Sequence, residues 1–283
     1  MLLAKISFIP HMDHEEAELV AVAEAWLGTL LKNGQICGNH VTGWTDGIYI
    51  AYVRMSHRKA GEHRYLSEWG RHTLAAVIGQ FGAEPVWEIL DDEVAARRPS
   101  WKSARSLYLF THFLHIDSPV FHGNRGTSLP LQLLPTSERL REEIFDWSES
   151  CRFHDRIFLE SGALELPAYE QLANPASELM SRGRELAKAV ETATKKPTYV
   201  YLLRHWGHLE FEDIRPCPKC GGGWRDPDSP MPSKEPFCRF HFRCESCRLV
   251  SHRAVAFEQN EHWKIGVPTG WTSADSSQRS GNP

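Results

Sequence analysis

The order of apolar and polar positions in the first thirty-five residues predicts a strand followed by a helix. Residues 2–9 form a short apolar run that is typical of a strand. Asp13 and Glu16 have the spacing of a capping box, which marks the start of a helix that ends at Gly34. Apolar side chains recur at helical spacing between them: Leu19, Val20, Ala23, Trp26, Leu27, Leu30 and Leu31.

The next fifty-five residues predict two strands, a second helix and a further strand. Residues 35–41 form a weak strand, and residues 48–55 form a stronger one that is rich in β-branched and aromatic side chains. An amphipathic helix follows over 64–81 and is capped by Gly82, and residues 84–90 form a strand. The resulting βαββαβ order is the split βαβ pattern, so we expect a ferredoxin-like α+β domain over residues 1–130. The apolar run 106–116 adds a strand beyond this core unit.

The middle of the chain, residues 131–207, changes to a helical pattern. Asn174 is placed as an N-cap with Pro175 at the first helical position, and Pro197 lies beyond the helix end. Residues 198–206 have high β propensity and are expected to return as a strand to the N-terminal sheet. The preceding helix has an apolar stripe of Leu140, Ile144, Trp147 and Cys151.

Composition limits the class of protein. The chain has 283 residues, 41% of them hydrophobic, which is enough for two or three domains. Its net charge of −4 argues against a protein built mainly to coat nucleic acid. The first residues have no basic leader and no apolar stretch reaches membrane-span length, so we expect a cytoplasmic protein without a membrane partner. Seven cysteines in that compartment indicate metal ligands or free thiols.

Four of the cysteines have the spacing of a zinc ribbon. Cys217 and Cys220 form one CxxC pair, Cys244 and Cys247 form another, and 23 residues separate the pairs. Two such turns supply the four tetrahedral sulfur ligands that Zn²⁺ accepts. We therefore predict one structural Zn²⁺ in a ribbon over residues 208–258, followed by a flexible tail over 259–283.

Two further residues could join this site. Cys238 and His241 are also three positions apart and lie just before the second pair. Cys244 and Cys247 are the preferred ligands because they close the symmetrical arrangement, which leaves Cys238 as a plain thiol.

The predicted ribbon carries a modest positive charge. Residues 211–257 contain eight Lys or Arg and six Asp or Glu, and four thiolates with one Zn²⁺ would cancel that excess. Four arginines could still share one nucleic-acid-binding face with Phe240 and Phe242 stacking on bases. The arginines are Arg239, Arg243, Arg248 and Arg253. The favoured interpretation is that the aromatic rings pack the hairpins and the arginines are solvated.

The stretches "GRELAKAVETATKKPTYVYLLRHWG", "EDIRPCPKCGGGW" and "FHFRCESCRLVS" resemble a bacterial family of uncharacterised proteins that contain a zinc ribbon. The resemblance is most specific over residues 183–251. It implies metal ligation by the four ribbon cysteines and a nucleic-acid-binding role, which is itself inferred from the ribbon. It also implies a further CxxC pair after a Ser-Pro, but "SPVFHGNRGTSLPL" here contains no cysteine.

Two other clusters have a functional and a structural interpretation. Residues 54–72 hold five Lys or Arg and three His near a helix start, which predicts either an anion site or a solvated basic surface. His112, His115 and His122 lie near Asp117, but His112 and His115 face opposite sides of a strand. A structural role is favoured for these histidines over a metal-dependent enzyme site.

The helical middle is acidic, with nine Asp or Glu and four Lys or Arg over residues 138–170. The common catalytic motifs are absent from the sequence, so we expect a binding protein and not an enzyme. The first hypothesis is a zinc-ribbon protein that binds nucleic acid. The alternative is a protein-binding module, such as an immunity protein that neutralises a toxin through its acidic surface.

Overall fold

A computed structural model of the chain shows two compact units, which are described separately. The first contains residues 1–103, 116–120 and 128–146, and the second contains residues 104–115, 121–127 and 147–283. The structure describes residues 2–11, 14–90, 100–112, 117–226, 240–257, 261–268 and 270–271. Asp13, His115, Cys238, Arg239 and most of the predicted tail lie outside these ranges.

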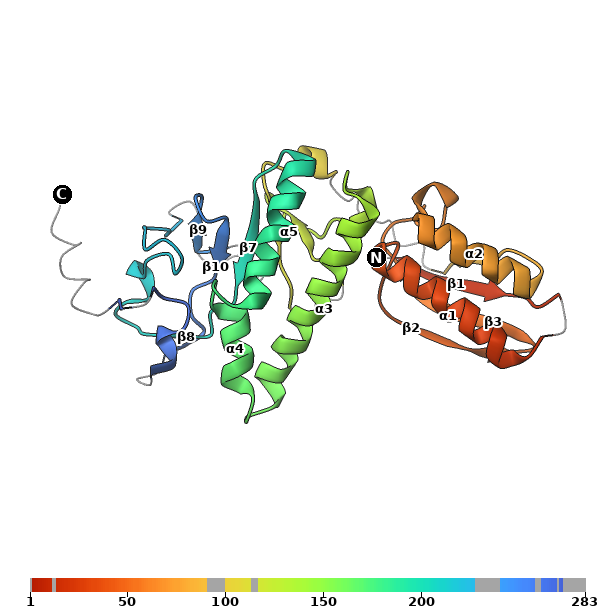
Figure 1. The fold of residues 1–283 in the computed structure, drawn as a ribbon, viewed down its shortest axis with the longest axis horizontal. Coiled ribbons are helices and arrows are strands. Elements are labelled where there is room, and N and C mark those ends of the chain that lie inside the picture. Colours follow the sequence, from red (N-terminus) through yellow and green to blue (C-terminus); the bar gives the residue numbers. More distant parts are fainter. Residues whose placement is uncertain are drawn as a thin grey trace. The chain divides into compact units, whose positions relative to one another are not determined.

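The first unit has the βαββαβ order that the sequence predicts (Figure 1). Its four strands form an antiparallel sheet in the order β2-β3-β1-β4, so that β1 and β3 are the central pair. The elements are β1 (Leu2–Phe8), α1 (Glu16–Lys32), β2 (Ile36–Thr45), β3 (Ile48–Met55), α2 (Glu68–Phe81) and β4 (Val86–Ile89). Short 3₁₀ turns cover His63–Tyr65, Trp101–Ser103 and Leu131–Leu133.

The core of this unit lies between the sheet and its two helices. Alternate residues of β1 are buried, and Phe8 contacts Trp26 of α1 and Phe81 of α2 at ring-centroid distances of 5.9 and 5.5 Å. The N-terminus of α2 is capped by the Ser67 side chain, which accepts a hydrogen bond from the Gly70 N–H. Burial of alternate residues in β1 and β3 fixes the register of this central pair.

The second unit contains a five-stranded sheet in the order β6-β5-β7-β10-β9. Figure 1 labels β7, β10 and β9 of this sheet. Strand β7 pairs in parallel with both β5 and β10, and β10 pairs antiparallel with β9. The strands are β5 (Leu107–Leu109), β6 (Val120–His122), β7 (Thr198–Leu202), β9 (Phe242–Cys244) and β10 (Leu249–Ser251). A second sheet of two strands joins β8 (Trp206–Gly207) to β11 (Ala256–Phe257).

This topology corrects the expectation that residues 198–206 return to the N-terminal sheet. β7 pairs instead with β5 and with β10, a strand of the predicted ribbon. The predicted strand over 106–116 is short and lies in this same sheet. Local patterning indicates a strand but carries no signal for its distant partner.

Three helices follow β6 along the chain: α3 (Glu138–Glu160), α4 (Glu165–Ala173) and α5 (Glu178–Thr194). The first part of α3, up to Asp146, belongs to the first unit, and the rest of α3 with α4 and α5 belongs to the second. In the second unit, 3₁₀ turns cover Glu212–Ile214 and Glu261–Lys264. The N-cap of α5 is Ser177, whose Oγ accepts from the Met180 N–H, and not Asn174 as the sequence predicts. Asn174 ends α4, and its Oδ1 accepts from the Ala176 N–H. No helix in the described part of the chain has the length and apolarity that crossing a membrane requires.

Candidate metal centre

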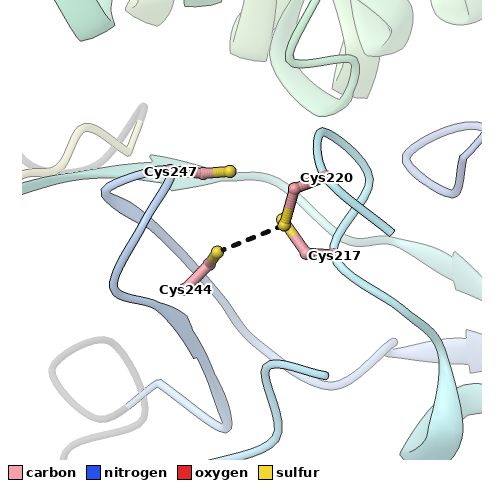
Figure 2. A group of neighbouring side chains, drawn as sticks. All are labelled: Cys217, Cys220, Cys244 and Cys247. Carbon is pink, nitrogen blue, oxygen red and sulfur yellow. Dashed lines mark hydrogen bonds between the residues drawn. The ribbon is translucent and has the colours of Figure 1, made fainter. Parts of the chain in front are cut away.

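Four cysteine side chains converge in the second unit, and we call them the cysteine cluster: Cys217, Cys220, Cys244 and Cys247. Cys217 and Cys220 belong to a turn that follows the 3₁₀ turn Glu212–Ile214, which we call the first knuckle. Cys244 ends β9 and Cys247 lies in the β9–β10 hairpin, which we call the second knuckle. All four sulfur atoms lie within 4.8 Å of one another, and Sγ of Cys220 and Cys244 are 3.7 Å apart (Figure 2).

Backbone hydrogen bonds close the first knuckle. The Cys217 N–H donates to Gly222 O over 2.7 Å, and the Gly221 N–H donates to Cys217 O over 2.8 Å. Gly221 has a φ of +69°, which a residue with a side chain adopts at a cost. A backbone hydrogen bond from Gly222 lowers the pKa of the Cys220 thiol to about 7, whereas burial raises the pKa of Cys217.

The second knuckle places Arg248 where the first has Gly221. Arg248 has a φ of +53°, which is unfavourable for a residue with a Cβ. Its guanidinium donates to both carboxylate oxygens of Glu191 on α5, at 3.0 and 3.1 Å, and also to Glu245. These bonds hold the hairpin in its turn conformation, so Arg248 has a structural role.

Every predicted nucleic-acid-binding arginine that the structure describes has an acidic partner. Arg243 pairs with Asp226 and Glu245, and Arg253 pairs with Asp213 at 2.9 Å. Arg248 pairs with Glu191 and Glu245, and Arg239 lies outside the described residues. The described arginines therefore do not form a row of free cations.

The two aromatic residues expected on the nucleic-acid-binding face, Phe240 and Phe242, are packed and do not offer free faces. Phe242 is fully buried and Phe240 is 7% exposed. Phe240 stacks on Tyr201 of β7, and Phe242 lies against Trp224 and the Arg215 guanidinium. Both rings are packed, as the favoured interpretation expects, with Phe240 against β7 and Phe242 inside the ribbon. The described arginines, which that interpretation expects to be solvated, are paired with carboxylates.

The structure describes one of the two alternative ligands. Cys238 lies outside the described residues. Nδ1 of His241 accepts the Arg253 N–H over 3.2 Å, and His241 is not one of the side chains that converge with the four sulfurs.

Several members of the other sequence clusters have partners within the chain. In the basic segment 54–72, Lys59 and Arg64 both pair with Glu62, and His63 lies 3.2 Å from Glu84. His122 is buried and its Nδ1 accepts the Asn124 N–H, while Asp117 accepts from Ser128. Within the described ranges, the cysteine cluster is the one group of three or more potential metal ligands.

A buried charge network next to the first knuckle was not predicted from the sequence. Glu212 is completely buried and accepts from Arg204 at 3.0 Å and from Arg215 at 3.1 Å. Arg215 also donates to Ser251 and to the carbonyl of His252, and Arg204 donates to the carbonyls of Trp263 and Ile265. The only sequence signal was an arginine two residues before Cys217, which does not reveal its partners.

Comparison with known proteins gives a family but not an activity. Residues 101–203 match a domain of unknown function (DUF2310), and residues 207–257 match another (DUF8594). Two uncharacterised proteins of Haemophilus influenzae are each 33% identical over 161 residues, or 56% of this chain. The match covers 74% of one relative and 58% of the other.

Two solved structures match about a third of the chain. They are an antibiotic biosynthesis monooxygenase, at 11% identity, and Rv0793 from Mycobacterium tuberculosis, at 18% identity. The matches cover 33% and 34% of this chain and 99% of each other chain, both with a TM-score of 0.25.

Proposed function

We propose a function from the residues of this chain, which belongs to the bacterial family that carries the DUF2310 domain and includes the Haemophilus influenzae relatives. The members of this family found by comparison are uncharacterised, so they do not supply a function. We propose a non-enzymatic binding protein with a structural four-cysteine zinc ribbon and with nucleic acid as its ligand. The observation that supports the zinc ribbon is the convergence of four sulfur atoms within 4.8 Å.

The spacing of the sulfurs fits a tetrahedral zinc ion. A Zn–S bond of about 2.3 Å places the sulfurs of a tetrahedron about 3.8 Å apart. The distance between Sγ of Cys220 and Sγ of Cys244 is 3.7 Å. Thiolates that bind zinc in this way leave no position for water or substrate, which suits a structural ion and not a catalytic one.

The ion would supply stability that the ribbon cannot obtain from a large apolar core of its own. β9 and β10 have three residues each, and the two knuckles lie at one end of them. A metal bound by both knuckles would fix the β9–β10 hairpin against the first knuckle.

Nucleic-acid binding is tested by fluorescence anisotropy with fluorescent single-stranded and duplex oligonucleotides at low and moderate salt. We expect saturable binding that weakens linearly in a plot of log K against log salt concentration, because phosphate contacts release counterions. A chain loaded with one equivalent of zinc that binds neither probe at low salt would exclude this function.

An acidic groove in the first unit supports a second candidate, a protein partner. The groove has a volume of about 760 Å³ and lies along α1, α2 and the start of α3. It is lined by four carboxylates and two cations: Glu24, Glu68, Glu138, Glu142, Lys32 and Arg139. Trp69 is 59% exposed there and stacks on His72 at 5.0 Å.

Such a groove suits a basic side chain of a protein, since carboxylates and an indole face both attract a cation. Affinity capture of the tagged chain from its native cells should then yield one stoichiometric protein that survives nuclease treatment. Trp69→Ala should lose this partner and Phe153→Ala, at another exposed aromatic residue, should retain it. Equal recovery by both variants would count against the groove.

A further inference from the structure

A cavity of about 570 Å³ in the second unit lies directly beside the first knuckle. Pro218 and Lys219, the two residues between the first pair of cysteines, form one side of it. The junction of α4 and α5 and residues 264–268 form the others, and Trp271 completes the lining. The volume falls within the range of small-ligand sites, roughly 300–1,000 Å³.

The lining of this cavity is cationic. It contains Arg184, Lys219 and Lys264 and a single carboxylate, Glu170. Arg184 donates to two neutral acceptors, the Pro175 carbonyl and Ser181 Oγ, each at 3.0 Å, so its charge is positioned but not neutralised. Lys219 is exposed and has no carboxylate partner among the described residues, whereas Lys264 pairs with Glu261.

The walls of the cavity are held by buried contacts. Arg204 donates to the carbonyls of Trp263 and Ile265 at 2.9 and 2.7 Å. Gly266 has a φ of +78°, and a Cβ at this position would lie 3.0 Å from the Ala173 carbonyl oxygen, so the backbone of this wall lies close against the end of α4. The Trp271 ring is half-buried and contacts Phe211 and Trp263 edge to face at 5.8 and 6.0 Å.

We propose that this cavity binds one nucleotide of a single-stranded nucleic acid, with its phosphate on the cations and its base against Trp271. The inference rests on the proposed nucleic-acid function. It assigns the contact to residues other than Arg243, Arg248 and Arg253, which are paired with carboxylates. A base inside a cavity cannot remain stacked in a duplex, so the site selects single strands. Base stacking on an aromatic ring tolerates every base, which predicts weak sequence preference.

The proposal also gives the metal centre a role in binding. Lys219 lies between two cysteines of the cluster, so an ion held by Cys217 and Cys220 fixes the backbone that carries the lysine. Arg215, Glu212 and Arg204 then connect the first knuckle to the opposite wall at Ile265 through direct hydrogen bonds.

The test is fluorescence anisotropy of the full chain, loaded with zinc, using a short fluorescent oligothymidylate and a matched duplex. We expect tighter binding of the single strand. Trp271→Ala should weaken it roughly tenfold, a typical loss for one stacked base, and Trp271→Phe should retain most of the affinity because it keeps a ring. Lys219→Ala should reduce the slope of log K against log salt concentration by about 0.7, the value for one phosphate contact on a single strand.

Two variants serve as matched controls. Lys188→Ala removes an exposed lysine of α5 outside the cavity, and Phe153→Ala removes an exposed aromatic ring of α3. Both should bind as the parent chain does.

The outcomes separate the two proposals. If the parent chain binds the probe and Trp271→Ala and Lys219→Ala both bind equally well, the cavity assignment is wrong and the nucleic-acid function stands. A preference for the duplex would also overturn the cavity assignment. If the parent chain binds neither probe, the proposed function itself fails.

Discussion

At the scale of single residues, the four clustered cysteines have different surroundings although their spacing in the sequence is symmetrical. Cys217 is completely buried, whereas Cys220 is exposed and its thiol accepts a backbone hydrogen bond. Burial raises the pKa of Cys247 to about 11. A bound cation would remove these differences, because a coordinated thiol is deprotonated whatever its surroundings.

Substitution of one clustered cysteine should remove the metal. We expect the purified parent chain to contain one zinc per chain by elemental analysis and Cys217→Ser to contain almost none, since three thiolates do not complete the closed site. Cys151→Ser is the matched control, because Cys151 is also buried but lies outside the cluster. Stoichiometric zinc in Cys217→Ser would show that the ligand assignment is wrong.

A buried histidine in the same unit gives a pH-dependent stability. Burial, together with neighbouring His241 and His112, lowers the pKa of His252 to about 4, from an ordinary value of 6.5, and its Nδ1 lies 3.2 Å from the Tyr201 hydroxyl. The unfolded chain therefore binds this proton at a higher pH than the folded chain does. The contribution to stability is complete above pH 6.5 and is lost as the pH falls toward 4.

Replacement of His252 should flatten this dependence. Between pH 7 and pH 5, the free energy of unfolding of the parent chain should fall by about 2 kcal/mol more than that of His252→Gln. Urea denaturation of both chains at the two pH values measures this difference. Acid release of the metal lowers the stability of both chains by the same amount, so it cancels in the comparison. Equal losses would show that His252 does not titrate in this way.

For helices and strands, the sequence predicted where each element lies along the chain better than which strands pair with one another. The βαββαβ order followed from apolar periodicity because β1, β3 and both helices of the first unit have one buried face, and β4 and most of β2 alternate between partly buried and exposed positions. β7 has a nearly continuous buried pattern, which indicates a strand inside a sheet but not which sheet. Its pairing with β5 and β10 depends on contacts between segments about fifty to ninety residues apart, which no local pattern contains.

The same limit applies to the candidate site. CxxC spacing identified the four cysteines that converge, because each knuckle is a local turn. The arginines of the ribbon were predicted as a face for nucleic acid, but the carboxylate partners of those that the structure describes include Glu191, which lies on α5. Arg184 and Trp271 come from segments far from both knuckles, so sequence spacing could not place them at one cavity.

The Arg204–Glu212–Arg215 network joins the loop after β7, the segment before the first knuckle and residues 261–268. Glu212→Gln should destabilise the second unit by about 3–5 kcal/mol, because it leaves two buried guanidiniums without a countercharge. Thermal unfolding measures the loss. Glu210→Gln, at an exposed position two residues away, should change the midpoint little. Similar stabilities for both variants would contradict the role of the network.

At the scale of the whole molecule, the two units should respond differently to removal of the metal. The cysteine cluster lies wholly in the second unit, and β10 of the hairpin pairs with β7 inside its main sheet. Loss of the ion should therefore destabilise the five-stranded sheet as well as the ribbon. The first unit has its own core around Phe8 and Trp26 and contains none of the four cysteines.

Hydrogen–deuterium exchange with and without a chelator measures this difference. We expect faster exchange in β7, β9 and β10 after chelation and unchanged exchange in β1 and β3. Apo protein that regains slow exchange in β7 on addition of zinc would show that the effect is reversible. Protection that is lost equally in both units would contradict independent stability.

Because β7 pairs with β10, the main sheet of the second unit cannot be completed during synthesis until β10 has emerged from the ribosome. β7 ends at Leu202 and its partner ends at Ser251, so a growing chain carries β7 with one edge unpaired until about fifty more residues have emerged. An unpaired edge of a buried strand is a site for aggregation. Chains truncated between Leu202 and Ser251 should accumulate in the insoluble fraction of the producing cells. A shortage of metal during synthesis should lower the yield of native protein.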